Sequence, residues 1–308
     1  MHRVVALTGA TGFLGSVIAQ HFFHAGWHVR SLVRSSSDTS RLSEISTELI
    51  LGSLHDHDSL QCLTQGVEAI VHCAGITRGT THADFGPVNI DSITHILHAI
   101  QAQPRAPRFL LISSLAAREP DLSPYAASKR AGERVLMNAE PPFPWGIFRP
   151  PAVYGPGDQE LLPLFQWMAR GLALLLGPPE ARFSLLYVHD LARAVLKWVE
   201  QPRSPSKIYE LHDGQVGGYT WQDITQTMAH VRKGHIIQLR IPRIVLTSLA
   251  MMNQRIARIT GTPAMLTTGK VQELTHINWV CDNTAFTEAT GWTPLVSLKE
   301  GLQQTLAL

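Results

Sequence analysis

Near its N-terminus the chain reads Thr8-Gly9-Ala10-Thr11-Gly12-Phe13-Leu14-Gly15. The apolar run before this turn, at residues 4–7, is typical of a buried strand, and residues 16–23 after it have the apolar spacing of a helix. Gly9 permits a tight turn, Gly12 lets a phosphate approach the backbone, and Gly15 lets the helix pack on the strand. Because a helix N-terminus offers unpaired N–H groups and the positive end of its dipole, this arrangement predicts a pyrophosphate-binding site.

A second motif follows about a hundred residues later, Tyr125-Ala126-Ala127-Ser128-Lys129. Tyr125 and Lys129 are four residues apart, so they share one face of a helix, and Pro124 suits the start of that helix. A lysine ammonium beside a phenol favours the phenolate and lowers the pKa of the tyrosine. The motif therefore predicts that Tyr125 donates or accepts a proton near neutral pH.

Length and composition limit the classes of protein to consider. The 308 residues, 44% of them hydrophobic, can form one large domain or two closely joined ones. A formal net charge of +2 gives no indication of nucleic-acid or bulk membrane binding, and no apolar run reaches the length of a membrane span. Three cysteines without a Cys-x-x-Cys pair fit a reducing, cytoplasmic location. We expect no metal, because the run His55-Asp56-His57-Asp58 is interpreted as the start of a helix.

The order of elements predicts the fold class. Strand patterns recur through the first half of the chain, with helices between them, which is the pattern of a parallel, doubly wound sheet. The predicted strands are residues 4–7, 28–33, 48–51, 69–73, 108–112 and 145–148, and the helices between them include 89–101 and 125–138. After Pro150 and Pro151 the pattern loosens, and later helices are expected at 189–200, 221–230, 242–260 and 298–306.

With these two motifs the chain resembles the extended short-chain dehydrogenases, also called the NAD-dependent epimerase/dehydratase family. Further motifs in the family's order are residues 149–156 (RPPAVYGP), 187–192 (YVHDLA), 291–294 (GWTP) and 298–302 (LKEGL), with Asn89 at the family's helix asparagine. The resemblance covers nearly the whole chain and implies an α/β, Rossmann-type sheet followed by a smaller, mostly helical substrate domain. We expect a dinucleotide-binding domain at 1–155, to which about 184–212 return, and a substrate-binding region at 156–308.

The resemblance also implies the chemistry. Tyr125 would shuttle a proton at a substrate hydroxyl or carbonyl, and Lys129 would hold the nicotinamide ribose and depress the pKa of the tyrosine. The family places a serine or threonine at the end of the fifth strand, against the substrate oxygen, but the aligned position here is Leu115. Either Ser114 fills this role, as we expect, or the polarising hydroxyl is missing.

The end of the second strand bears on the choice of cofactor. NAD is usually bound by an acidic residue there, whereas a nearby arginine accommodates the 2′-phosphate of NADP. Val33 takes the acidic position and Arg34 follows it, so NADP is favoured over NAD. The predicted cofactor-binding residues are Thr8, Gly9, Thr11, Gly12, Phe13, Leu14, Gly15, Arg34, Ser35, Ser53, Leu54, Cys73, Ala74, Gly75, Ser113, Lys129, Pro150 and Val153.

Three functions remain open from the sequence. The first is an NAD(P)-dependent oxidoreductase that transfers hydride at a carbonyl or secondary alcohol. The second is a nucleotide-sugar epimerase or dehydratase, which in this family often carries an arginine where this chain has Phe183, one residue after Arg182. The third is a non-catalytic, NADP-binding or assembly protein.

The substrate and the assembly state are less well determined. The substrate is expected to be a small molecule, and its contacts are expected at Thr77, Arg78, Tyr154 and Arg182. A homodimer is expected from the resemblance, through the helices at 89–101 and 125–138.

Overall fold

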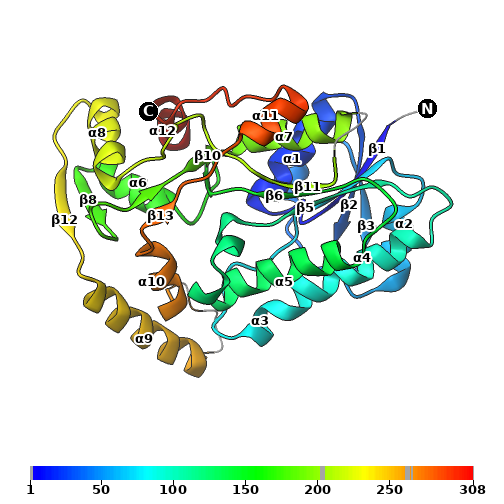
Figure 1. Ribbon diagram of the computed structural model, residues 1–308, viewed down its shortest axis with the longest axis horizontal. Coiled ribbons are helices and arrows are strands. Elements are labelled where there is room, and N and C mark those ends of the chain that lie inside the picture. Colours follow the sequence, from blue (N-terminus) through cyan, green and yellow to red (C-terminus); the bar gives the residue numbers. More distant parts are fainter. Residues whose placement is uncertain (1–2, 202–204, 261–263, 265, 308) are drawn as a thin grey trace.

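The computed structural model describes residues 3–201, 205–260, 264 and 266–307 (Figure 1). Its centre is a sheet of seven strands in the order β11-β6-β5-β4-β1-β2-β3, in which every neighbouring pair is parallel. The strands are β1 (Val4–Thr8), β2 (His28–Val33), β3 (Thr47–Leu51), β4 (Ala69–His72), β5 (Arg108–Ile112), β6 (Trp145–Arg149) and β11 (Lys207–Glu210). The predicted doubly wound fold is confirmed. The strand order reverses between β1 and β4, and ligands bind beyond the carboxyl ends of strands at such a point.

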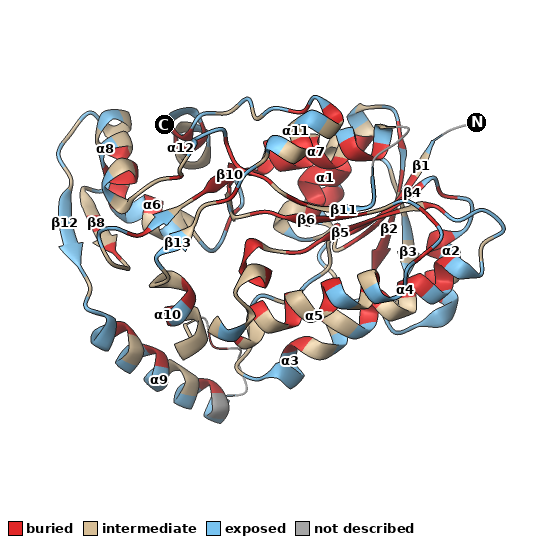
Figure 2. Cartoon of the chain, viewed as in Figure 1, coloured by how far each residue is buried: buried red, intermediate tan, exposed pale blue. Residues whose placement is uncertain are grey.

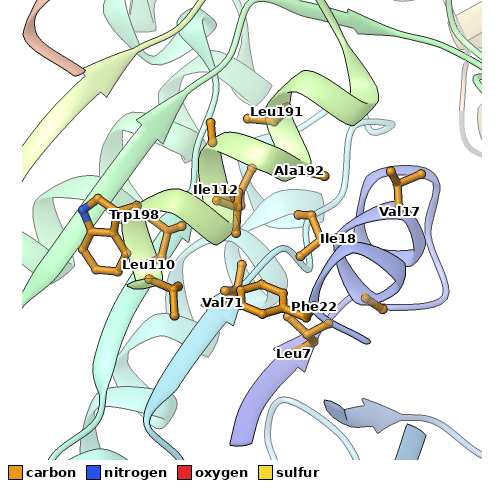
Figure 3. Close-up of a cluster of buried hydrophobic side chains, with 14 of the residues drawn as sticks. Leu7, Val17, Ile18, Phe22, Val71, Leu110, Ile112, Leu191, Ala192 and Trp198 are labelled. Atoms are coloured by element: carbon orange, nitrogen blue, oxygen red, sulfur yellow. The ribbon is translucent and has the colours of Figure 1, made fainter. Parts of the chain in front are cut away.

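Helices cover both faces of this sheet (Figure 1). On one face lie α1 (Phe13–His24), α7 (Val188–Glu200) and α11 (Thr284–Thr290), and on the other α2 (His57–Thr64), α4 (Ser92–Gln101) and α5 (Pro124–Asn138). Figure 3 shows Phe22 of α1 beside Val71 of β4, and Trp198 of α7 beside Leu110 of β5, within one buried cluster. All four side chains are fully buried, and each contributes roughly 1.5–3 kcal/mol of burial free energy or more. This packing fixes the start of α1 against the carboxyl edge of the sheet.

One predicted helix begins later than expected. The segment at 89–101 starts with a π-helical turn, Pro87–Asp91, after the short helix α3 (His82–Gly86), and α4 proper begins at Ser92. The side chain of Asn89 accepts a hydrogen bond from the backbone N–H of Ile76 at 2.9 Å and donates one to its carbonyl at 3.1 Å. The asparagine thus ties the loop after β4 to this turn. Single 3₁₀ turns occur at Ser40–Leu42, Leu115–Arg118 and Pro120–Leu122.

The chain leaves the main sheet after β6 and later returns to it. It forms β7 (Ala152–Tyr154), α6 (Leu162–Ala169), β8 (Leu172–Leu175), β9 (Arg182–Phe183) and β10 (Leu185–Tyr187). β10 pairs with β7 outside the seven-stranded sheet, whereas α7 packs against α1 and β11 pairs with β6. The strand at 207–210 is therefore the one in this stretch that joins the central sheet.

The remaining elements form a smaller lobe. They are α8 (Trp221–Arg232), β12 (Ile237–Arg240), α9 (Arg243–Thr260), α10 (Thr268–Leu274), β13 (Asn278–Trp279) and α12 (Leu298–Leu306). Phe165, Met168, Met228 and Leu302 are buried in a core of this lobe. Figure 2 shows β12 and α9 at the edge of the molecule with much of their surface exposed. Among the described residues, no helix has both the length and the apolar character that crossing a membrane requires.

Candidate active site

The glycine turn lies at the carboxyl end of β1, and its geometry excludes side chains. Gly9 has φ +72°, and a Cβ atom there would lie 2.6 Å from the backbone nitrogen of Ala74. A Cβ atom on Gly15 would lie 2.0 Å from the carbonyl oxygen of Gly9. Gly12 is exposed, has extended backbone as the N-cap of α1, and gives that helix no side-chain cap. The first N–H groups of α1, at Phe13 and Leu14, thus have no partner within the helix, and a pyrophosphate site at this turn stays a prediction.

Thr8 and His72 hold the ends of β1 and β4 together below this turn. The Thr8 hydroxyl is bonded to Nδ1 of His72 at 2.7 Å and accepts the N–H of Ala74 at 3.3 Å, while Nε2 of His72 contacts the Ser92 hydroxyl at 3.1 Å. Burial, with Lys129 nearby, lowers the pKa of His72 to about 3, so the ring is neutral. The hydroxyl of Thr8, a predicted cofactor residue, is thus used to support the site from below. The sequence analysis missed His72. The one feature that could have indicated it is a histidine at the end of a strand that is otherwise apolar and buried.

Beside His72, burial raises the pKa of the Cys73 thiol to about 12, so the group stays protonated. Cys73, Ala74 and Gly75 follow β4 directly and form the wall opposite the glycine turn. A Cβ atom on Gly75 would lie 3.0 Å from Nζ of Lys129. The glycine therefore leaves room between the end of β4 and the lysine.

At the end of β2, Val33 is buried and Arg34 is exposed. The backbone N–H of Arg34 donates to Oγ of Ser37 at 3.1 Å, and the N–H of Ser37 donates to the Arg34 carbonyl at 2.9 Å, which closes a tight turn. Within the described part of the chain the Arg34 guanidinium has no ion pair, whereas Arg30 is bonded to Glu48 at 2.9 Å. Ser35 is exposed beside Arg34. The turn thus offers a cation that is available to a ligand.

Ser53 and Leu54 lie at the end of β3, where they lead into α2. The Ser53 hydroxyl accepts the backbone N–H of His55 at 3.3 Å, and the Leu54 carbonyl contacts Nδ1 of His95 on α4 at 2.9 Å. These contacts fix the loop at the predicted adenine end of the site. Among the described residues, no group of histidine, cysteine and acidic side chains could hold a metal ion.

Tyr125 lies in the first turn of α5, whose N-cap Ser123 accepts the backbone N–H of Ala126 at 2.9 Å. The Ser114 hydroxyl lies close enough to the Tyr125 phenol to lower the pKa of that phenol. The Ser114 hydroxyl also accepts the N–H of Ala116 at 3.2 Å, and Leu115 is turned inward with 2% of its surface exposed. Leu115, the position aligned with the family's hydroxyl, is thus buried, and the catalytic role of Ser114 stays a prediction.

The pKa of Tyr125 moves opposite to the predicted direction. Burial of the phenol raises it, the nearby Ser114 hydroxyl lowers it, and the carboxylates of Glu273 and Glu160 raise it further. Lys129 is directed elsewhere, since its Nζ donates to the Ile112 carbonyl at 3.2 Å beside Gly75. Burial lowers the pKa of Lys129 itself, while Cys73 and Glu133 act to raise it. The predicted lowering of the tyrosine pKa by the lysine is therefore not found here.

A buried ion pair supports the end of β5. Arg149 donates to both oxygens of Glu133, at 2.8 Å and 2.6 Å, and the Ser113 hydroxyl donates to Oε1 at 2.6 Å. Glu133 is completely buried. The Ser113 side chain, predicted to contact the cofactor, is thus directed toward this carboxylate. The sequence analysis missed Glu133 because a glutamate in a helix is usually exposed.

Two further predicted cofactor residues follow β6. The Pro150 carbonyl accepts the backbone N–H of Leu115 at 2.8 Å, and Val153 packs against the core cluster around α1 and α7. Both therefore support the loop that carries Ser114.

A small, partly enclosed pocket lies over Tyr125. Its walls come from the loop after β4, the start of α5 and the smaller lobe, and are formed by Thr77, Arg78, Gly79, Phe85, Ser123, Pro124, Tyr125, Glu160, Ala264, Thr267, Lys270 and Glu273. Arg78 pairs with Glu160 at 3.2 Å, Lys270 with Glu273 at 3.4 Å, and Ser123 donates a hydrogen bond to Glu273. The sequence analysis expected Thr77 and Arg78 here, but no motif marks Glu160, Lys270 or Glu273.

The two other predicted substrate contacts lie outside this pocket. Tyr154 is completely buried, with its ring against Phe165 and Tyr187. The Arg182 guanidinium donates to the carbonyls of Gly217 at 2.6 Å and Gly218 at 3.1 Å. The first side chain packs the lobe and the second ties two of its loops together.

Comparisons with known proteins agree with this arrangement. The ceramide reductase of Caulobacter vibrioides (strain NA1000 / CB15N) is 39% identical over 278 residues, which cover 90% of this chain and 85% of that protein. A putative epimerase from Burkholderia cenocepacia J2315 has the same fold, with a TM-score of 0.77 at 20% identity over 99% of this chain and 97% of that one. UDP-glucuronic acid 4-epimerase from Bacillus cereus, solved with UDP-glucuronic acid and NAD, has a TM-score of 0.76 at 18% identity, over 99% and 98% of the two chains.

The pattern that defines the NAD dependent epimerase/dehydratase family matches residues 5–211, from β1 to the residue after β11. This span contains the glycine turn, the Tyr125–Lys129 motif and the whole central sheet. The chain therefore belongs to the NAD dependent epimerase/dehydratase family and is an NAD(P)-dependent oxidoreductase of that family.

Proposed function

We propose that the protein is an NADP(H)-dependent reductase that converts a carbonyl group of a ceramide-like lipid into a hydroxyl group. The observation that carries the chemistry is that Tyr125 lines the pocket and that the Ser114 hydroxyl lies close enough to its phenol to lower the pKa. The substrate class is supported by the relative named ceramide reductase, which matches 90% of this chain.

The bound nicotinamide supplies the hydride. The Tyr125 phenol is protonated at neutral pH and would donate its proton to the carbonyl oxygen as that oxygen gains charge. Ser114 holds the same oxygen with its hydroxyl and orients it toward the phenol. The first amides of α1 would hold the pyrophosphate, and Lys129 would hold the nicotinamide ribose through the space that Gly75 leaves open.

The preference for NADP rests on the turn after β2. Val33 cannot accept a hydrogen bond from a ribose hydroxyl, and Arg34 is an exposed guanidinium suited to a phosphate dianion. Arg34 would therefore bind the 2′-phosphate of NADP.

An assay of the whole chain on two substrate classes tests the reaction. We expect NADPH to be oxidised in the presence of a ceramide-like ketone in detergent micelles, and UDP-glucose or UDP-glucuronic acid to remain unchanged in the presence of NAD. Interconversion of the UDP-sugars would instead support an epimerase. Binding of NADPH with no turnover of either class would support a non-catalytic protein. The position of Arg182 argues against an epimerase function. Its guanidinium is bonded to two backbone carbonyls and is therefore not available to the diphosphate of a nucleotide sugar.

We also propose a homodimer that pairs α4 and α5 with the same helices of a second copy. Ala126 is completely buried, and Val135 and Met137 pack against a core cluster of the same subunit, so the interface would use the outer residues Ala127, Ala131 and Arg134. Light scattering at micromolar concentration checks this, and a monomer would contradict it.

A cytoplasmic location stays a prediction from the three cysteines, each of which is free.

A further inference from the structure

Helix α9 exposes an unusual amount of apolar surface. Ile244 is 75% exposed and Ile259, near the other end of the helix, is 85% exposed. The apolar residues exposed along this helix, here called the α9 outer face, are Ile244, Val245, Leu249, Met251, Met252, Ile256 and Ile259. On the preceding strand β12, Ile237 and Leu239 are also exposed. A patch of this kind on a single lobe marks an interaction site.

The outer face is distinct from the side by which α9 packs on the protein. At about 100° of rotation per residue, the seven residues of the outer face fall within an arc of about 160°. Leu246, Ala250 and Ala257 lie on the opposite side and are buried, the first two against Val271 of α10. The helix therefore meets its packing needs with one side and leaves unused, among the described residues, a second side that is apolar except for Ser248 and Arg255. Figures 1 and 2 show this helix at the edge of the smaller lobe.

The charge around this face is strongly one-sided. Residues 224–272 contain no aspartate or glutamate and seven lysines and arginines, although the formal net charge of the whole chain is only +2. The seven are Arg232, Lys233, Arg240, Arg243, Arg255, Arg258 and Lys270. Arg240, Arg243 and Arg255 are exposed and form no ion pair in the described part of the chain. An overall net charge near neutrality thus conceals a basic segment at residues 224–272.

We propose that α9 and β12 form a docking surface that lies flat on an anionic lipid bilayer. A helix with a wide apolar face and arginines beside it binds in the plane of a membrane interface, with its apolar residues among the acyl chains and its cations at the lipid phosphates. The absence of acidic residues from 224–272 matches a negatively charged surface. A second copy of the chain fits less well, because a twofold interface would bring like arginines together.

The docking surface leads directly to the pocket over Tyr125. Ala264, Thr267 and Lys270 follow α9 in the sequence and line that pocket. A bilayer under α9 would therefore lie next to the walls through which a lipid reaches the tyrosine. The docking proposal goes beyond the proposed reaction and does not rest on it, since binding to vesicles needs neither cofactor nor turnover.

Sedimentation of the whole chain with lipid vesicles tests the proposal. The probes are vesicles of phosphatidylcholine alone and of phosphatidylcholine mixed with phosphatidylglycerol. We expect binding to the anionic vesicles, weaker binding to the neutral ones, and release at high salt because the lipid charges are screened.

A variant carrying Met252→Glu and Ile256→Glu should bind the anionic vesicles at least about tenfold more weakly, since two charges would enter the acyl region. The matched control is Val216→Glu with Leu295→Glu, which places the same charges at residues that are 86% and 69% exposed outside this surface. The control should bind like the original chain. Circular dichroism and NADPH binding confirm that each variant is folded.

Three outcomes would overturn the proposal. They are no binding of the original chain to anionic vesicles, equal binding of the α9 variant, and equal loss of binding in the control. The original chain could fail to bind vesicles and form a dimer that is lost in the α9 variant. In that case the outer face is a subunit interface and the docking proposal is wrong.

Discussion

The carboxyl edge of the central sheet and the α9–α10 segment are built differently. At the sheet edge, Gly9 and Gly15 allow contacts between backbone atoms that no side chain could share, and Thr8 and His72 bond to each other in the interior. In the α9–α10 segment, α9 is held by a few buried residues and exposes a whole apolar side. The first region is held by close backbone contacts, whereas the second exposes apolar side chains to the surroundings.

The largest effect on stability should come from the buried pair beneath the sheet edge. Glu133→Ala leaves the Arg149 guanidinium buried without a carboxylate, so we expect it to cost about 3–5 kcal/mol of unfolding free energy. Met252→Gln, on the outer face of α9, should change that free energy by less than about 0.5 kcal/mol. Urea unfolding measures both. Equal losses would show that the two regions do not differ in the way described.

A smaller effect is expected for cofactor affinity at the exposed end of β2. Arg34→Ala should weaken NADPH binding by about 1–3 kcal/mol, the range for a charged hydrogen bond, and leave NADH binding nearly unchanged. Fluorescence titration with the two nucleotides measures this. Arg41→Ala is a control, because that guanidinium bonds to the Gly157 carbonyl at 3.2 Å. Tighter binding of NADH than of NADPH by the original chain would contradict the NADP assignment.

The smallest predicted effect links the two regions through charge. Because the Glu273 carboxylate on α10 raises the pKa of Tyr125, Glu273→Gln should lower that pKa. Reduction needs the protonated phenol, so activity is present below this pKa and is lost as the pH rises through it. The alkaline limb of kcat/KM should thus move to lower pH. Glu288→Gln, at an exposed residue of α11, is the control, and an unchanged limb in Glu273→Gln would exclude this coupling.

The parts of the molecule that could be predicted from sequence are those fixed by local patterns. Alternating strands and helices predicted the parallel sheet, and the glycine spacing predicted the turn after β1, because steric limits on the backbone leave few residues that can form it. Tyr125 and Lys129 were placed on α5 by their spacing of four residues.

The remainder depends on contacts between distant segments. Glu160 and Glu273 raise the pKa of Tyr125 although they lie 35 or more residues away in the sequence. No sequence motif indicates that these carboxylates lie near the phenol. The inward turn of Leu115, the outward position of Ser114 and the burial of Tyr154 follow from packing with other elements. The pKa of Tyr125 was predicted in the wrong direction because spacing alone carries no information on burial.

The most direct test of the proposed reaction is the turnover of Tyr125→Phe with NADPH and a ceramide-like ketone. The substitution removes one hydroxyl group, so the unfolding free energy and the affinity for NADPH should stay close to those of the original chain. Turnover should fall by at least about a hundredfold, the usual contribution of a positioned proton donor, and Ser114→Ala should lose roughly tenfold, as for one hydrogen bond. Turnover of Tyr125→Phe near the original rate would contradict the account.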